Sequence, residues 1–225
     1  MSNFPLFKIS QSDRKDFCET IIDSSAPNAD FYFLVILSAL IVTLGLAKDN
    51  VILLIGGMLV APILSSILAI SLGLIILNGK VVFRSVWILL TSIIVSVLVS
   101  FFIGIITYHD IKTIELMSYM EVSLYTFMVA LIAGTAASYT WSKPNLNSTL
   151  PGIAITVTLI PPMAAIGLAL ASMHYSLALV ALQVLFLNIF GIIIASLAVF
   201  FLMEFYKAKR KIIAEMKEEE REFAK

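Results

Sequence analysis

The sequence predicts an all-α integral membrane protein with six transmembrane helices, arranged as two inverted repeats of three helices. Three observations support this fold. The chain has six long apolar runs, its charges lie in the gaps and at the two ends, and the second run of each half is broken by proline. Of 225 residues, 60% are hydrophobic and the mean hydropathy is +1.01. These values lie well above the usual balance of a soluble domain.

The six runs contain no Asp, Glu, Lys or Arg. A hydrocarbon core about 30 Å thick needs roughly 20 apolar helical residues to cross it. Five runs are long enough, and the first, with 17 residues, is at the short end. We therefore expect a transmembrane domain at 31–203, with repeat one at 31–107 and repeat two at 122–203. The runs are 31–47, 51–79, 85–108, 122–142, 144–173 and 175–203.

The two ends of the chain are polar. Residues 1–30 carry five acidic side chains and no cleavable signal pattern, so the first span is expected to act as its own insertion signal. Apolar residues within 9–25 predict a short amphipathic helix on the cytoplasmic membrane surface. Residues 204–225, basic first and acidic later, predict a charged cytoplasmic C-terminal helix.

The orientation follows from the basic residues near the span ends, because cytoplasmic loops carry an excess of Lys and Arg. Six spans place two basic residues, Lys48 and Lys112, on one side of the membrane, together with His109 and His174. Both termini are therefore predicted to be cytoplasmic, in a multi-pass protein of the plasma (inner) membrane. The ten basic residues on the cytoplasmic side are Lys8, Arg14, Lys15, Lys80, Arg84, Lys143, Lys207, Lys209, Arg210 and Lys211.

A shift of 100 residues lays the second half of the chain on the first. It aligns Leu59–Pro62 with Leu159–Pro162, which puts the broken run second in each trio. Because each repeat has an odd number of spans, the two halves must be inverted relative to one another. Inverted repeats with interrupted helices at matching positions are typical of secondary transporters.

Proline removes a backbone N–H and clashes with the carbonyl four residues back. The breaks are therefore predicted to free carbonyls that coordinate a polar solute or ion, with nearby hydroxyls from Ser and Thr. A simple kink packed against its neighbours is the alternative for each break. The candidate pathway residues are Gly56, Gly57, Pro62, Ser65, Ser66, Gly152, Thr156, Thr158, Pro161, Pro162 and Asn188.

Other chemistry is not indicated. No Asp, Glu, Lys, Arg or His lies inside a predicted span, so proton relays and voltage sensing have no side chains to work with. No catalytic pair, metal-ligand set or cofactor motif is found, so we expect neither an enzyme nor a bound cofactor. No pattern for nucleic-acid binding is found either, so we expect no nucleic-acid partner. Gln183 and Asn188 should face protein, because an unpaired amide is costly in lipid.

Small residues recur at every fourth position in two runs, and such stripes let helices pack closely. We expect them to support close packing within the chain or in a homo-oligomer. They are Ser92, Ser96, Ser100 and Gly104 in the third run, and Ala130, Gly134 and Ser138 in the fourth.

Several of these glycine and proline segments carry a family resemblance. They are Leu44–Leu46, Ile55–Pro62, Ser71–Leu74 and Leu150–Ile155 running into Leu159–Pro162, with Asn188 in the last run. At these residues the chain resembles a bacterial and archaeal family of multi-span membrane proteins known as an uncharacterised hydrophobic domain. The match covers about 31–203 and differs at Ser66, where members often carry a second proline. The resemblance implies a prokaryotic membrane protein of multi-span fold, often joined to a soluble domain, with no agreed activity.

The function expected from the sequence is passage of a small solute or ion at the interface of the two broken helices, within the lipid bilayer. The alternative is a non-transporting membrane scaffold or sensor subunit that acts through contacts with a partner. Liposome flux separates the two, because only the first moves solute.

Overall fold

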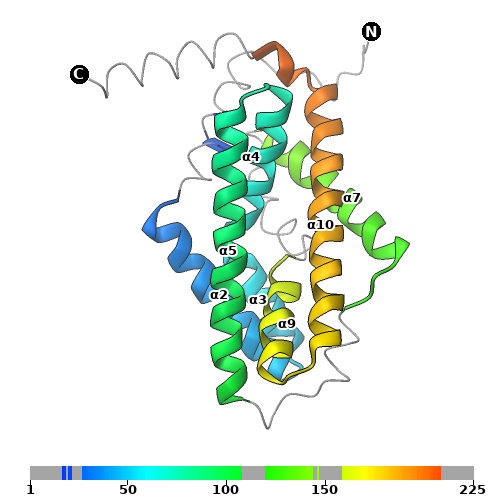
Figure 1. The fold of residues 1–225 in the computed structure, drawn as a ribbon. Coiled ribbons are helices and arrows are strands. Elements are labelled where there is room, and N and C mark those ends of the chain that lie inside the picture. Colours follow the sequence, from blue (N-terminus) through cyan, green and yellow to red (C-terminus); the bar gives the residue numbers. More distant parts are fainter. Residues whose placement is uncertain are drawn as a thin grey trace, which may run out of the picture.

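A computed structural model describes residues 17–18, 20–21, 27–107, 120–143, 146 and 159–208. All regular elements within these residues are helical, which confirms the all-α prediction (Figure 1). The elements are α2 (Ala29–Ala47), α3 (Val51–Val60), α4 (Ile63–Ile75), α5 (Gly79–Ile106), α7 (Leu124–Trp141), α9 (Ile160–Ala171), α10 (Tyr175–Leu202) and the short 3-10 helix η4 (Phe205–Ala208).

The second apolar run is broken where the sequence predicts. α3 ends at Val60, and α4 begins at Ile63 after a bend of 49°. Ala61 is extended, with φ −74° and ψ 124°, and Pro62 occupies the N-cap position of α4. Proline cannot donate a helical hydrogen bond, so the chain stops one helix and starts another there.

Three described helices, α2, α5 and α10, are long and apolar enough to cross a membrane, and there are four if the bent pair α3–α4 counts as one span. α9 is apolar but has only 12 residues, and α7 has 18. Apolar helices of this kind are typical of a membrane protein. The count of six spans stays a prediction, because residues 108–119 and 147–158 lie outside the described part of the chain.

Three helix pairs are joined by turns of the same geometry. In each turn one residue adopts a left-handed conformation, with φ values of 51° at Asp49, 55° at Leu77 and 57° at Met173. The next residue donates its backbone N–H to a carbonyl five positions back, for example Asn78 to Gly73 at 2.9 Å. This is the Schellman motif, which ends a helix and reverses the chain. α4 and α5, and α9 and α10, therefore form tight helical hairpins.

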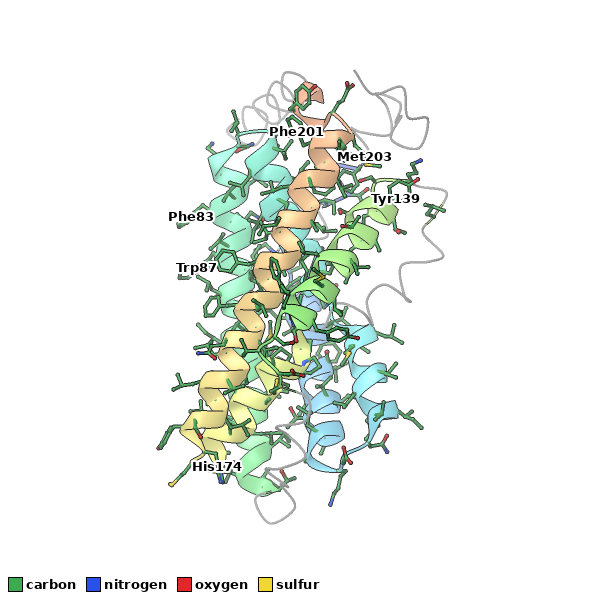
Figure 2. The ribbon with its side chains drawn as sticks, turned by 90° about the vertical axis from the view of Figure 1, so that its right-hand side faces the viewer. Phe83, Trp87, Tyr139, His174, Phe201 and Met203 are labelled. Carbon is green, nitrogen blue, oxygen red and sulfur yellow. The ribbon has the colours of Figure 1, made fainter. Side chains whose placement is uncertain are left out.

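The two hairpins point in opposite directions (Figure 1). The α4–α5 turn lies at one end of the bundle and the α9–α10 turn at the other, so α5 and α10 run antiparallel. Figure 2 shows His174 at one end, and Tyr139 and Met203 at the opposite end. On the outer side Phe83 and Trp87 point away from the bundle. Both are more than 60% exposed, as expected of side chains that face lipid.

The hairpins also share one burial pattern. α5 and α10 both contain 28 residues, and their first residues, Gly79 and Tyr175, lie 96 positions apart. At this separation all eight buried residues of α5 fall on buried residues of α10. The same shift carries each buried residue of α4 onto a buried residue from Leu159 to Ala169. The outer faces match too: Phe83, Leu90, Ile94 and Leu98 correspond to Leu179, Phe186, Phe190 and Ile194, all exposed.

The separation of 96 residues differs from the 100 predicted by aligning the prolines. Four residues make about one helical turn, so the two registers differ by only about 40° around the helix axis. The pattern of apolar and polar positions is therefore similar in the two registers. The helix ends decide between them, because α5 and α10 start and stop together only at the smaller shift.

Small residues bring the helices into close contact within the chain. A Cβ added to Gly167 of α9 would lie 2.5 Å from the Val97 carbonyl oxygen of α5, and one added to Gly104 would lie 2.6 Å from the Ala171 Cβ. A Cβ added to Gly134 of α7 would lie 2.7 Å from the Cα atom of Ile192 in α10. The predicted stripes in the third and fourth runs therefore pack against other helices of the same chain.

The described residues near the N-terminus belong to this packing. Phe17, Cys18 and Ile21 are buried in a cluster with residues of α4, the end of α10 and η4. The Phe17 ring centroid lies 5.4 Å from that of Phe200 and 4.9 Å from that of Phe205. These contacts attach the segment to the protein core. The rest of the predicted surface helix at 9–25, and the tail beyond residue 208, lie outside the described residues.

Candidate functional site

The two shorter helices, α4 and α9, each cover about half of a long helix. At 1.5 Å per residue, α5 and α10 are about 42 Å long, whereas α4 and α9 are about 20 Å and 18 Å long. α4 extends inward from one end of the bundle and α9 from the other (Figure 1). Because both begin inside the bundle and end at its surface, both N-termini lie near the middle.

Close contacts fix where the two N-termini lie along α5. Gly73 of α4 packs against Val82 of α5. Because the two helices are antiparallel, ten residues back along α4 match ten residues forward along α5, which places Ile63 opposite Ser92. Gly167 packs against Ser100, and Gly104 against Ala171. Both contacts join residues 67 positions apart, as expected of parallel helices, and the same separation places Ile160 of α9 opposite Ile93 of α5.

Residues 92 and 93 are the midpoint of α5, so the N-termini of α4 and α9 approach the same level from opposite directions. Ile63, Leu159 and Ile160 belong to one large buried cluster that also includes residues of α2, α5 and α10, and α4 and α9 make few direct contacts with each other. We call this region the meeting point, defined by Ile63, Ile160 and the facing residues 92–93.

The end of α3 packs against α2. Gly57 is buried, and a Cβ there would lie 2.5 Å from a Val42 methyl carbon and 3.0 Å from the Val42 backbone nitrogen. Its carbonyl oxygen accepts a hydrogen bond from the Ser38 hydroxyl at 2.7 Å. Gly56, its neighbour, has nothing within 4 Å of its added Cβ. The break therefore needs Gly57 for close packing, and Ser38 supplies a donor to a carbonyl at the end of α3.

Pro62 and Ser65 form the start of α4. The Ser65 hydroxyl donates to the Pro62 carbonyl at 2.7 Å, and the Ser65 backbone N–H donates to the same oxygen at 3.2 Å. The sequence predicted that Ser65 would offer its hydroxyl to a solute. In the structure that hydroxyl closes the first turn of α4.

Pro161 and Pro162 begin α9 and are both buried. A helix leaves its first N–H groups without intrahelical partners, and proline in the first turn lacks such a group. The pair therefore reduces the number of unpaired donors at a helix end placed inside the bundle. The carbonyls that these prolines were predicted to free belong to residues 157 and 158, outside the described residues.

Three buried hydroxyl oxygens among the described residues have no hydrogen-bond partner, those of Ser66, Ser96 and Ser196. Ser66 lies in the fourth position of α4. Ser96, in the register set by Gly167 and Ser100, lies opposite Met163, the fourth residue of α9. Each of these two hydroxyls is thus about one turn from the meeting point. Ser196 lies six residues, about 9 Å, from the end of α10 and away from the meeting point.

The amides of α10 have different surroundings. Asn188 is 2% exposed, makes a polar interaction and lies at the midpoint of the helix, level with the meeting point. Gln183 is exposed, so it does not face protein within its own chain. It takes the place on the outer face of α10 that Trp87 takes on α5. The remaining candidates, Gly152, Thr156 and Thr158, lie outside the described residues.

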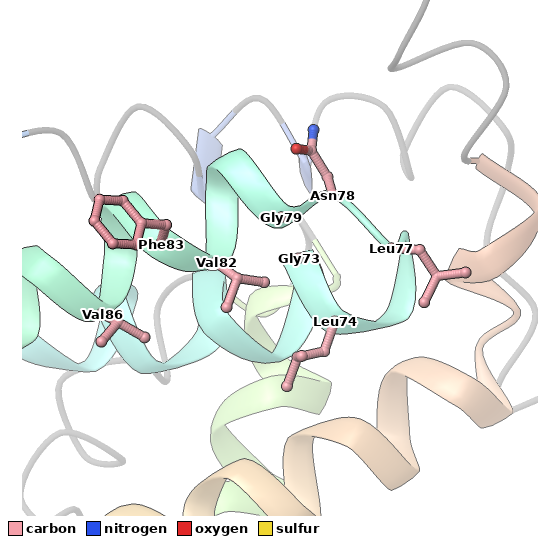
Figure 3. Close-up of a pocket in the computed structure, with 8 residues that line it drawn as sticks. All are labelled: Gly73, Leu74, Leu77, Asn78, Gly79, Val82, Phe83 and Val86. Carbon is pink, nitrogen blue, oxygen red and sulfur yellow. The ribbon is translucent and has the colours of Figure 1, made fainter.

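A surface groove of about 450 Å³ lies beside the α4–α5 turn, lined by residues of that hairpin from Gly73 to Val86 (Figure 3). It is at the end of the bundle, about 20 Å from Pro62 along α4, so it is separate from the meeting point. No group of three or more His, Cys, Asp or Glu side chains among the described residues could hold a metal ion.

The sequence analysis named the prolines, Gly57, Ser66 and Asn188 as candidates, and their place in a functional site stays a prediction. It did not name Ser38. Ser96 was noticed only as part of a small-residue stripe. Its place beside the first turn of α9 follows from the α5–α9 contact of the structure, which the sequence alone does not give.

A family model described as Domain of unknown function (DUF389) matches residues 58–194. An uncharacterized protein of Methanocaldococcus jannaschii is 27% identical over 167 residues, covering 74% of this chain and 52% of that protein. The chain thus spans about half the length of the curated relative it matches. No solved structure matches the chain significantly. The matched region includes Pro62 and the pair Pro161–Pro162, and the family resemblance predicted from these segments is confirmed.

Proposed function

We propose a transport function for this chain, which belongs to the DUF389 family of proteins of unknown function. The proposed activity is passage of a small solute or ion across a prokaryotic plasma membrane at the meeting point. One observation carries the proposal: two half-length helices begin near the middle of the bundle, from opposite directions, beside the midpoint of α5.

The physical argument concerns the cost of helix ends in lipid. An unsatisfied backbone polar group costs several kcal/mol in hydrocarbon, so irregular backbone at membrane depth is tolerated only inside protein or beside a water-filled cavity. Transporters place their substrate sites at such discontinuous helices. A protein that needed only to be anchored would be more stable with continuous helices, so the paired half-helices favour a function at that level.

The proposed topology is six spans in two inverted repeats, with both termini in the cytoplasm. The opposed hairpins and their shared burial pattern support the inverted relation. Lys80 and Arg84 lie at the start of α5, at the same end of the bundle as Lys143 and η4, whereas Lys48 lies at the other end. The excess of basic residues at the first end supports a cytoplasmic location for it.

A second candidate is a membrane scaffold or sensor subunit. The exposed amide of Gln183 on the apolar outer face of α10 favours this function, since polar side chains in membrane helices commonly bind a neighbouring helix. Such a contact would serve a homo-oligomer or a partner protein.

Reconstitution in liposomes tests the proposal. Purified protein should speed the flux of at least one class of small solute (inorganic anions, inorganic cations or neutral polar solutes) above that of protein-free liposomes. Pro62→Ala, which restores a backbone N–H at the break, should lower that flux. Pro27→Ala, before α2 and away from the meeting point, is the matched control and should leave it unchanged. Absence of flux for all three classes would contradict transport and favour the scaffold. Equal flux of the two variants would reject the meeting point as the path of the solute.

A further inference from the structure

We propose that the groove beside the α4–α5 turn binds one anionic phospholipid, with an acyl chain in the groove and the headgroup at Lys80 and Arg84. We call it the lipid groove, defined by the residues from Gly73 to Val86 that line it (Figure 3). The inference rests on insertion of the helices in a membrane. It is independent of the proposed transport.

The groove exists because two of its lining positions carry no side chain. Gly73 is buried, and a Cβ there would lie 2.8 Å from a methyl carbon of Val82, so α4 and α5 touch at this point. Gly79, the first residue of α5, is exposed, and an added Cβ would meet nothing within 4 Å. The hairpin is thus closed at Gly73 and open at Gly79.

The walls of the lipid groove are apolar and face outward. Leu74 and Leu77 lie on its α4 side, and Phe83 and Val86 on its α5 side (Figure 3). All four side chains are exposed. In a membrane such a surface is in contact with acyl chains, and a hollow in it holds a chain on more than one side.

The groove also lies at the depth where a phospholipid changes from polar to apolar. α5 is about 42 Å long, and a hydrocarbon core is about 30 Å thick. A centred, upright α5 therefore extends about 6 Å, or four residues, beyond the core at each end. Residues 79–82 are then level with the headgroups, whereas Phe83 and Val86 are level with the acyl chains.

The charges at this end of the bundle select an anionic headgroup. Lys80 and Arg84 are exposed and lie one turn apart on α5. Helical side chains lean toward the N-terminus of their helix, and long basic side chains extend to the membrane surface. Both charges are therefore directed to the headgroup layer at the open end of the groove. With Lys143 they outnumber Glu204, an acidic residue at the same end after α10, and basic sites on the cytoplasmic side of membrane helices attract anionic lipids.

The second hairpin lacks these features. At the separation of 96 residues, Lys80 and Arg84 correspond to Ser176 and Val180, and Gly79 corresponds to Tyr175. The α9–α10 hairpin thus repeats the exposed apolar positions without the basic pair or the open glycine. The proposed site is therefore a property of these residues and not of hairpin geometry alone.

The test uses the two tryptophans of the chain, Trp87 and Trp141. Trp87 is 61% exposed and lies one turn after Phe83, on the same outer surface of α5, whereas Trp141 packs against a buried cluster (Figure 2). The full-length Trp141→Phe variant is placed in phosphatidylcholine vesicles with a minor fraction of brominated phosphatidylglycerol, which quenches a tryptophan that it touches. Brominated phosphatidylcholine at the same fraction is the reference. Phosphatidylglycerol should associate at Trp87 about tenfold more strongly or better, since each basic residue contributes about fivefold.

Three variants in the same background test the site. Lys80→Gln and Arg84→Gln should each lower the preference for phosphatidylglycerol about fivefold. Gly79→Leu should lower it by filling the groove, and in detergent without lipid it should melt no lower than the parent protein, because a side chain there meets open space. The matched control is Lys143→Gln, a basic residue at the same end whose Nζ lies 4.9 Å from the Tyr139 ring centroid. Its loss should leave the preference unchanged.

Three outcomes would overturn the proposal. Equal quenching by the two lipids would reject an anionic headgroup. A preference that survives Lys80→Gln, Arg84→Gln and Gly79→Leu would place the lipid elsewhere. Weak quenching by both brominated lipids would show that another protein surface, such as a second copy of the chain, covers this face. None of these measurements depends on flux, so the proposed transport stands or falls separately.

Discussion

Gly56 and Gly57 are adjacent residues of α3 that the structure treats very differently, and this contrast gives a sharp stability prediction. A Cβ at Gly57 would lie 2.5 Å from a Val42 methyl carbon, 3.0 Å from the Val42 backbone nitrogen and 3.2 Å from the Ser38 carbonyl oxygen. A Cβ at Gly56 would meet nothing within 4 Å. Gly57→Ala should therefore destabilise the protein, and Gly56→Ala should not.

The magnitude follows from two terms. Replacing Gly by Ala in a helix contributes about 1 kcal/mol of stability through backbone entropy, and both variants share this gain. Forcing an extra methyl group into a packed contact costs about 1–3 kcal/mol, and only Gly57→Ala bears this cost. The difference between the two variants isolates the clash and should be about 1–3 kcal/mol. Gly56→Ala should be neutral or up to about 1 kcal/mol more stable than the wild type.

Thermal melts of purified protein in detergent measure the effect. For a chain of this length 1 kcal/mol corresponds to roughly 2–4 °C in Tm, so the two variants should differ by roughly 2–12 °C. Equal melting temperatures would refute the close approach of α3 to α2. A reversed order would show that the open side of α3 lies at Gly57 rather than Gly56.

Two further predictions concern one turn and one surface. Leu77 has a φ of 55° and is 73% exposed; Leu77→Gly should raise stability by up to about 1 kcal/mol in the same melts, because glycine adopts this conformation without a steric cost. Leu74→Gly, within α4, should lower it by about 1 kcal/mol, and a loss of stability in both would reject the left-handed turn. Gln183→Cys, in a Cys18→Ser background, should form a disulfide-linked dimer in oxidised membranes if α10 forms a homo-oligomer contact through this exposed position. Phe83→Cys on α5 should remain monomeric, and monomeric Gln183→Cys would show that this face meets lipid.

Much of the fold could be predicted from the sequence because the signals are local and physical. The absence of charge over long runs predicted the apolar helices, and a proline after two glycines predicted the end of α3. The turns carry a signal that went unused: Gly45 and Asn50 have the same spacing as Gly73 and Asn78. In both cases the glycine permits a close approach near the turn and the asparagine caps the next helix.

The register of the repeat could not be read from the prolines. Pro62 precedes the first residue of α4, whereas Pro161 and Pro162 are the second and third residues of α9. At the shift that aligns the helix ends, these two prolines correspond to Ser65 and Ser66. Proline and serine can both start a helix, so the two hairpins begin at the same level with different residues. An alignment of prolines is therefore displaced by one turn.

The direction of the half-helices decides what the breaks can bind, and residue identity alone does not give it. From the sequence, a proline in a membrane span suggests freed carbonyls that coordinate an ion or a polar solute. The structure shows which helix end lies where. At the first break the Ser38 and Ser65 hydroxyls satisfy two carbonyls, while α4 and α9 both direct their N-termini toward the midpoint of α5. The C-terminus of α3 lies next to the N-terminus of α4, so the opposite charges of these two helix ends offset one another there. The first turn of α9 contains two prolines, which carry no N–H group. Two of the three unpaired buried hydroxyls of the described residues, those of Ser66 and Ser96, lie about one turn to either side of that level. The helix ends and these hydroxyls therefore place polar groups at a depth where lipid could not satisfy them.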